Sequence, residues 1–73
     1  MGNATLTPFG KKIKKRLIDI DRNQSWLIEQ VTAKTGLYFD SSYMYKIMTG
    51  QLNTPGIIKA IREILDIHDV ETS

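Results

Sequence analysis

Apolar residues recur at helical spacing in the first third of the chain. Four of them follow one another at intervals of four, four and three residues: Phe9, Ile13, Leu17 and Ile20. These intervals place side chains on one side of an α-helix. Thr7 followed by Pro8 is a typical helix start, because threonine caps free N–H groups of the first turn and proline is tolerated at the first helical position. The pattern predicts a helix over residues 8–20.

The last third of the chain carries the strongest amphipathic pattern. Its apolar positions are Ile57, Ile58, Ile61, Ile64 and Leu65. Thr54 and Pro55 repeat the start signal of the first helix. Isoleucine is β-branched and common in strands, but a period of 3.6 residues kept over more than two turns favours a helix. We therefore predict a helix over residues 55–66.

Two shorter helices are predicted between these. In the first, the buried side would consist of Leu27, Ile28 and Val31. Ser25 is placed to cap its start, and Gly36 is placed to end it in the left-handed conformation that glycine adopts readily. These signals predict a helix over residues 25–35.

The next helix follows an apolar connection. Asp40 is typical of an N-cap, Gly50 is typical of a helix end, and the residues between them predict a helix over 41–49. Its buried stripe would consist of Tyr43, Met44, Ile47 and Met48. The segment "LYF" before Asp40 is too apolar to extend into solvent, so we expect it to fold back on the core.

These elements predict an all-α fold, with a helix-turn-helix inside one domain over residues 1–73. The domain would be a compact bundle of four helices, or of five if the C-terminal residues add a fragment of another. Residues 1–6 would form a flexible leader and residues 68–73 a flexible tail. The predicted core consists of Phe9, Ile13, Leu17, Leu27, Val31, Ile47, Ile58, Ile61 and Leu65.

Composition removes several classes of function. The 73 residues include no cysteine and only one histidine, His68, so neither a disulfide nor a thiolate metal site is expected. No apolar run approaches the length of about 20 residues that spans a bilayer, and the N-terminus lacks the apolar region of a signal peptide. No set of side chains matches a catalytic constellation. We expect a cytoplasmic protein that is not an enzyme and that needs neither metal nor cofactor.

Charge is distributed unevenly although the net charge is only +2. Five basic residues precede the first acid, Asp19: Lys11, Lys12, Lys14, Lys15 and Arg16. The C-terminal residues from Asp66 onward are acidic. A basic N-terminal third favours a polyanionic partner. A helix face that is simply solvated explains the same run equally well.

With the helices placed, the chain resembles the small phage-repressor and Cro-like helix-turn-helix proteins, the Xre family. The resemblance covers residues 9–67. It is carried in order by four segments: "FGKKIKKRLIDID", "QSWLIEQV", "DSSYMYKIMTG" and "QLNTPGIIKAIREILDI". The stretch from Val31 to Asp40 is several residues longer than the family's short turn. Either the second helix is extended or the turn is enlarged.

The resemblance implies a lambda-repressor-like fold and sequence-specific binding to double-stranded DNA. The helix over 41–49 would enter the major groove as the recognition helix, and the protein would bind a palindromic operator as a homodimer. The residues facing base edges would be Ser41, Ser42, Tyr45 and Lys46. Phosphate contacts would come from Lys11, Lys14, Lys15, Gln24, Ser25, Gln51 and Asn53.

A second class of function fits the same scaffold. A small helix-turn-helix protein can bind another protein, as an antirepressor or an inhibitor. The two classes differ in their response to salt, because phosphate contacts release counterions and an interface anchored on aromatic and methionine side chains does not.

Overall fold

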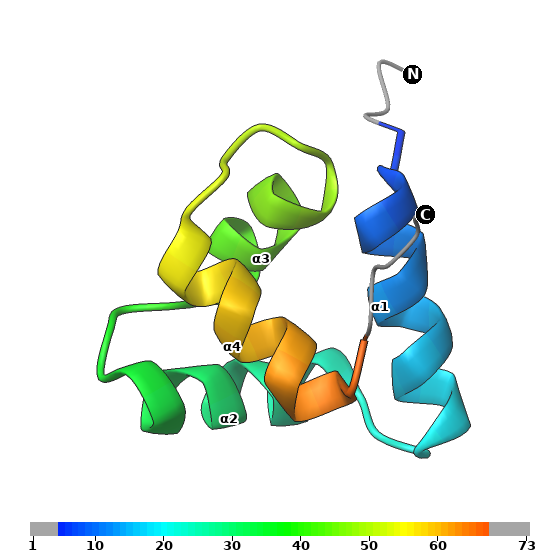
Figure 1. Cartoon of the computed structure of the whole chain (residues 1–73), viewed down its shortest axis with the longest axis horizontal. Helices are drawn as coiled ribbons and strands as arrows, with labels where there is room; N and C mark the ends of the chain where they lie inside the picture. Colours follow the sequence, from blue (N-terminus) through cyan, green and yellow to red (C-terminus); the bar gives the residue numbers. More distant parts are fainter. Residues whose placement is uncertain (1–4, 68–73) are drawn as a thin grey trace.

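The computed structural model describes residues 5–67, which fold into four α-helices (Figure 1). These are α1 (Pro8–Asp19), α2 (Gln24–Thr35), α3 (Ser41–Met48) and α4 (Pro55–Leu65). No residue within this range lies in a strand, so the all-α prediction is confirmed. Residues 1–4 and 68–73 lie outside the described residues, and with them most of the predicted leader, the whole predicted tail and His68.

Helix α4 crosses the centre of the molecule in Figure 1 and packs against α1 and α2. It makes its most extensive contact with α2, whereas α1 contacts both α3 and α4. Figure 1 shows α1 upright on one side, α2 along the base and α3 above it. The core is therefore built from residues far apart in the sequence.

Seven of the nine predicted core positions are buried: Ile13, Leu17, Leu27, Val31, Ile47, Ile61 and Leu65. The prediction was wrong in degree for Phe9 and Ile58, which are half-buried and pack against the core from its edge. Both line a shallow surface pocket, and the guanidinium of Arg62 covers the ring of Phe9 at 5.4 Å from its centroid. The pocket leaves one side of each residue open to solvent. Leu6, from the predicted leader, also packs against this core.

The start of α2 differs from its prediction. Asn23, not Ser25, is the N-cap, and its side-chain oxygen accepts the backbone N–H of Trp26 at 2.9 Å. Asn23 has the extended backbone (φ −110°, ψ 177°) that aims its side chain back at the first turn. Ser25 is exposed and lies inside the helix. Of the other three predicted side-chain caps, Thr7 and Asp40 are confirmed. The prediction was wrong for Thr54, which stands at the N-cap position of α4 but makes no side-chain capping hydrogen bond.

We expect Asn23→Ala to lower the free energy of unfolding by about 1 kcal/mol, because it removes the oxygen that satisfies a free N–H of the first turn. Ser25→Ala removes a polar side chain two residues after Asn23. It should change the free energy of unfolding much less than Asn23→Ala does, because the Ser25 side chain caps no N–H group. Urea denaturation followed by circular dichroism measures both. A larger loss from Ser25→Ala than from Asn23→Ala would contradict the observed cap.

The long stretch between the second and third helices is taken up mainly by α2. The helix continues to Thr35, and Gly36 ends it with a left-handed backbone (φ 70°) as predicted. The connection over residues 36–40 then leads into α3. Its expected return to the core holds for Phe39, which is buried, but not for Leu37 and Tyr38, which are 48% and 75% exposed. The connection therefore returns to the core at Phe39 alone of these three residues.

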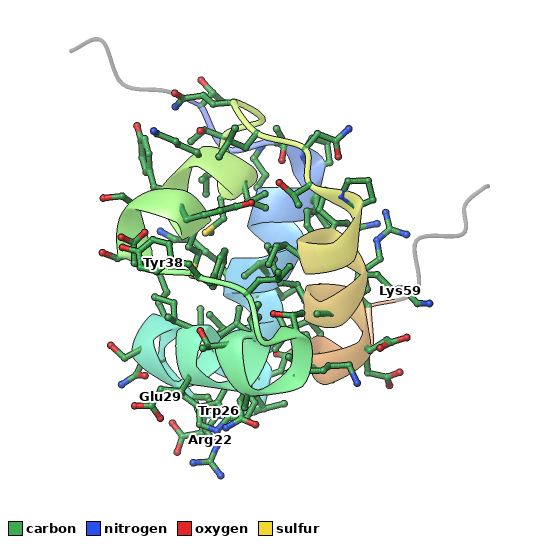
Figure 2. The ribbon with its side chains drawn as sticks, turned by 90° about the vertical axis from the view of Figure 1, so that its left-hand side faces the viewer. Arg22, Trp26, Glu29, Tyr38 and Lys59 are labelled. Atoms are coloured by element: carbon green, nitrogen blue, oxygen red, sulfur yellow. The ribbon has the colours of Figure 1, made fainter. Side chains whose placement is uncertain are left out.

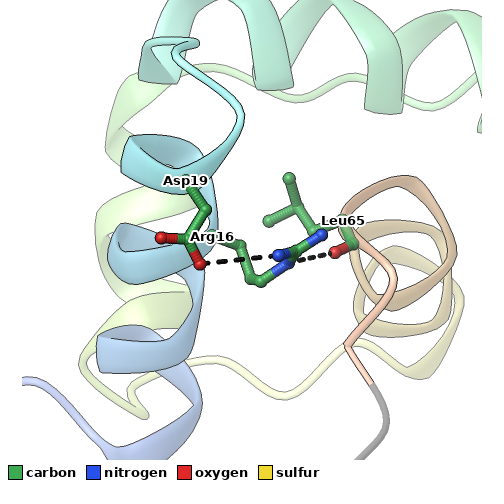
Figure 3. A network of polar contacts seen from close by, with 3 residues as sticks. All are labelled: Arg16, Asp19 and Leu65. Atoms are coloured by element: carbon green, nitrogen blue, oxygen red, sulfur yellow. Dashed lines mark hydrogen bonds and ion pairs between the residues drawn. The ribbon is translucent and has the colours of Figure 1, made fainter.

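Two contacts fix the outer helices in place. The C-terminal carbonyl oxygen of α3, on Met48, accepts both the backbone N–H and the hydroxyl of Thr7 at 3.0 Å. Arg16 of α1 reaches the C-terminal end of α4, where its Nε donates to the carbonyl of Leu65 at 2.8 Å, and its Nη1 lies 3.5 Å from Asp19 (Figure 3). These three hydrogen bonds satisfy two helix-terminal carbonyls that have no partner within their own helix. Arg16 thus holds the fold together, although the sequence places it in the basic run.

Candidate functional site

The exposed side of α3 is the candidate site. Its buried side consists of Met44, Ile47 and Met48. All four residues expected to read bases lie on the remaining surface: Ser41, Ser42, Tyr45 and Lys46. Ser41 and Tyr45 are four residues apart, as are Ser42 and Lys46, so the four side chains form two adjacent rows on the helix. Their predicted exposure is confirmed.

Tyr43 belongs to the support of this surface rather than to the surface itself. It is half-buried, and its ring packs against the ring of Phe39 with the two centroids 5.1 Å apart. Its hydroxyl forms a hydrogen bond of 2.7 Å with the hydroxyl of Thr54. This bond explains why Thr54 stands at the N-cap position of α4 without capping it. The pair links α3 to the start of α4.

The C-terminal end of α3 is closed by its own residues. The Thr49 hydroxyl donates to the Tyr45 carbonyl at 2.9 Å, and the side-chain amide of Gln51 donates to the Thr49 hydroxyl at the same distance. The backbone N–H of Gln51 donates to the carbonyl of Lys46 at 2.8 Å. Gln51 and Asn53 are both exposed just beyond α3, where the sequence predicts phosphate contacts. Gln51 retains an amide N–H that these bonds do not use.

The N-terminal end of α3 carries a feature that the sequence did not predict. One carboxylate oxygen of Asp40 accepts the backbone N–H of Tyr43 at 2.8 Å, and the other accepts the hydroxyl of Tyr38. The hydrogen bond from Tyr38 is the main cause that lowers the pKa of Asp40, followed by the bond from Tyr43, and the charge of Lys46 adds to it. The same bond, and then the charge of Asp40, raises the pKa of Tyr38. At neutral pH the carboxylate is therefore ionised and the phenol keeps its proton.

The basic residues expected to contact phosphates do not all lie at one place on the surface. Lys11, Lys14 and Lys15 are all exposed on α1. Lys14 shares a shallow pocket of about 300 Å³ with Asn23 and Gln24, at the start of α2. Lys15 instead lines a separate pocket together with Asp66, the residue that ends α4. The structure brings Lys14 and Gln24 together and does not bring Lys15 to them.

The start of α2 has free donors beside Lys14. Asn23 occupies the N–H of Trp26 through its side chain and that of Leu27 through its carbonyl. The N–H groups of Gln24 and Ser25 are the remaining donors of this first turn, and a helix N-terminus attracts anions. Arg22 lines the same pocket and lies 5.3 Å from the centroid of the Trp26 ring. This end of the molecule therefore combines positive charge with outward N–H groups.

The described residues contain neither a metal-binding cluster nor a membrane-spanning helix. Over residues 5–67 no group of three histidine, aspartate or glutamate side chains is placed to hold a metal ion. None of the four helices is both long enough and apolar enough to cross a bilayer. No family model, no curated protein and no solved structure matches this chain.

Proposed function

We propose that this protein is a sequence-specific DNA-binding transcriptional regulator of the phage-repressor and Cro type. The observation that carries the proposal is the outward side of α3, where Ser41, Ser42, Tyr45 and Lys46 lie together above a buried stripe. An α-helix fits the major groove of B-DNA, and recognition helices use their N-terminal residues to reach base edges. The protein would act in the cytoplasm, associated with the nucleoid.

Each of the four side chains has a chemistry suited to a base edge. The ammonium of Lys46 can donate to O6 and N7 of guanine, and serine hydroxyls can donate to or accept from several bases. Tyr45, which is 51% exposed, can pack its ring on a thymine methyl. One helix of eight residues reads few base pairs. We therefore propose a homodimer on a palindromic operator.

The phosphate contacts are assigned to both ends of the proposed interface. Lys14, Gln24 and Ser25 supply charge and N–H donors where α1 meets α2. Gln51 and Asn53 supply amide donors beyond α3. Lys11 and Lys15 contribute longer-range attraction from α1. Such contacts set the register of the protein on DNA and its salt dependence, not its sequence preference.

A protein-binding function has one specific observation in its favour. Leu37, Tyr38 and Tyr45 are large apolar or aromatic side chains, and each is about half exposed or more. Aromatic side chains are enriched in the centres of protein interfaces. An antirepressor or inhibitor would bind its partner with little dependence on salt, whereas log affinity for DNA falls linearly with log salt concentration.

Selection of binding sites from a random DNA pool tests the proposal, and Lys46→Ala tests its central residue. We expect a palindromic sequence to be enriched. Lys46→Ala should lower discrimination at one base pair of each half-site by about 1–3 kcal/mol. Lys59→Ala is the matched control, because it removes the same charge from α4 on the side of the molecule opposite Tyr38 (Figure 2). Fluorescence anisotropy against the selected and a scrambled site measures both variants.

Lys14→Ala separates phosphate contact from base readout in the same assay. It should weaken binding to both DNAs alike and make the salt dependence shallower by about one unit of slope. The absence of any enriched sequence would overturn the proposal. Equal effects of Lys46→Ala and Lys59→Ala would remove α3 from the readout role.

A further inference from the structure

Tyr38 is an exposed aromatic residue to which the proposed DNA interface assigns no role. It is 75% exposed, more than the other tyrosines of the described chain. It lies in the connection over residues 36–40, and its hydroxyl is bonded to the residue that caps α3. Figure 2 shows it on the α3 side of α2, with Lys59 across the molecule and Arg22 and Trp26 beyond the opposite side of α2. Its ring therefore stands at the N-terminal end of the helix proposed to read DNA.

The position of Tyr38 is fixed from both sides although its ring is in solvent. Phe39, the next residue, is 5% exposed and packs on Tyr43. Asp40 is held in turn by the backbone N–H of Tyr43 and by the Tyr38 hydroxyl itself. An exposed side chain without such bonds loses rotamer entropy when it binds, and this loss reduces affinity. Tyr38 has lost part of that freedom before any partner arrives.

The hydrogen bond to Asp40 decides which groups of DNA the hydroxyl can meet. A phenol has one O–H donor and otherwise only accepts. Because Asp40 takes the donor, the oxygen of Tyr38 has no proton to offer a phosphate, which itself only accepts. The ring face and edge remain available, and these suit the C5-methyl group of thymine, an apolar feature of the major groove.

We infer that Tyr38 is a further specificity-determining residue, which packs its ring on a thymine methyl beside the base pairs that face Ser41 and Ser42. The inference rests on the proposed function. The connection between α2 and α3 would then contribute to sequence readout together with α3. The Tyr38 hydroxyl has a second role, because it occupies a carboxylate oxygen of Asp40 that would otherwise face the negatively charged DNA unmasked.

Two substitutions separate the ring from the hydroxyl. Tyr38→Ala removes both, and we expect it to lower the preference for thymine at one position of each half-site about fivefold or more, with no change in the slope of log affinity against log salt concentration. Tyr38→Phe keeps the ring and unmasks Asp40, so it should weaken binding to every sequence alike and keep the thymine preference. Leu37→Ala is the matched control, because it truncates an exposed neighbour in the same connection.

Replacing that thymine by uracil in the DNA removes only the methyl group. The unaltered protein should bind the uracil-containing DNA more weakly than the thymine-containing DNA. The Tyr38→Ala variant should bind both DNAs with the same affinity. Binding of the selected DNA should also slow the nitration of Tyr38 by tetranitromethane, and mass spectrometry identifies the nitrated residue. This measurement uses the unaltered protein, so it does not depend on whether a variant folds.

A site preference that Tyr38→Ala leaves intact, or nitration of Tyr38 that DNA does not slow, overturns the inference while the proposed function stands. A salt slope reduced by Tyr38→Ala also overturns it, because that result indicates a phosphate contact. Failure of the unaltered protein to enrich any sequence overturns both.

Discussion

Replacing Ile61 by alanine is expected to lower the free energy of unfolding by about 2–5 kcal/mol. Ile61 lies in α4, at the centre of the molecule, and its side chain is fully buried. The substitution removes buried methyl and methylene groups and leaves a cavity. Helix α4 cannot move to close this cavity, because Thr54 holds its start to Tyr43 and Arg16 holds its end at Leu65. Small domains are held by about 5–15 kcal/mol in total, so the variant should be largely unfolded at moderate urea concentrations.

Ile18→Ala is the matched control for this change. It deletes the same atoms from a side chain of α1 that is 78% exposed, so its midpoint in urea should stay close to that of the unaltered protein. Circular dichroism at helical wavelengths follows both transitions. If Ile61→Ala unfolds at the same urea concentration as Ile18→Ala, α4 does not form the centre of the core.

Helical period predicts which side of a helix is buried and says little about how deeply. It found three of the four predicted buried residues of α3, with Tyr43 only half-buried, and the exposure of Tyr45 and Lys46 follows from that stripe. It could not show that Phe9 and Ile58 lie at the edge of the core, because their depth depends on a pocket formed by residues from several segments. The same limit applies to Lys14 and Lys15, which the sequence groups and the tertiary structure separates.

Helix starts are harder to predict where two capping residues stand close together. Asn23 and Ser25 are both favoured caps, and the backbone angles that the preceding turn imposes on Asn23 decide between them. Asp21, at φ 59°, lies in this turn. Tyr38 was missed for a related reason. The segment was expected to fold back as a unit, whereas only Phe39 is buried, and Leu37 and Tyr38 are exposed.

Helix propensity alone predicts that Gly10→Ala stabilises the protein, whereas we expect it to lower the free energy of unfolding. Alanine is favoured over glycine inside a helix by about 0.5–1 kcal/mol. Gly10 lies in the first turn of α1 and is buried against the end of α3. A Cβ atom there would lie 2.3 Å from the carbonyl oxygen of Met48 and 3.1 Å from its carbonyl carbon. Both are backbone atoms, so a side-chain rotation cannot relieve the overlap.

Relief requires α1 and α3 to move apart, and this motion breaks the contacts that hold them. The oxygen that the new methyl group would meet is the one that accepts both hydrogen bonds of Thr7. Overpacking costs about 1–3 kcal/mol and sometimes more, so the overlap outweighs the gain in helix propensity. We expect Gly10→Ala to be less stable than the unaltered protein by about 1–3 kcal/mol.

Gly56→Ala is the control that isolates propensity from overlap. Gly56 lies in the first turn of α4, and a Cβ atom there would meet nothing within 4 Å. This variant should be more stable by about 0.4–1 kcal/mol, because alanine restricts the unfolded chain. Thermal unfolding of the two variants should therefore shift in opposite directions. A Gly10→Ala variant as stable as Gly56→Ala would show that α1 does not approach α3 this closely. The hydrogen bonds from Thr7 to Met48, which hold α3 in position, would then not form as described.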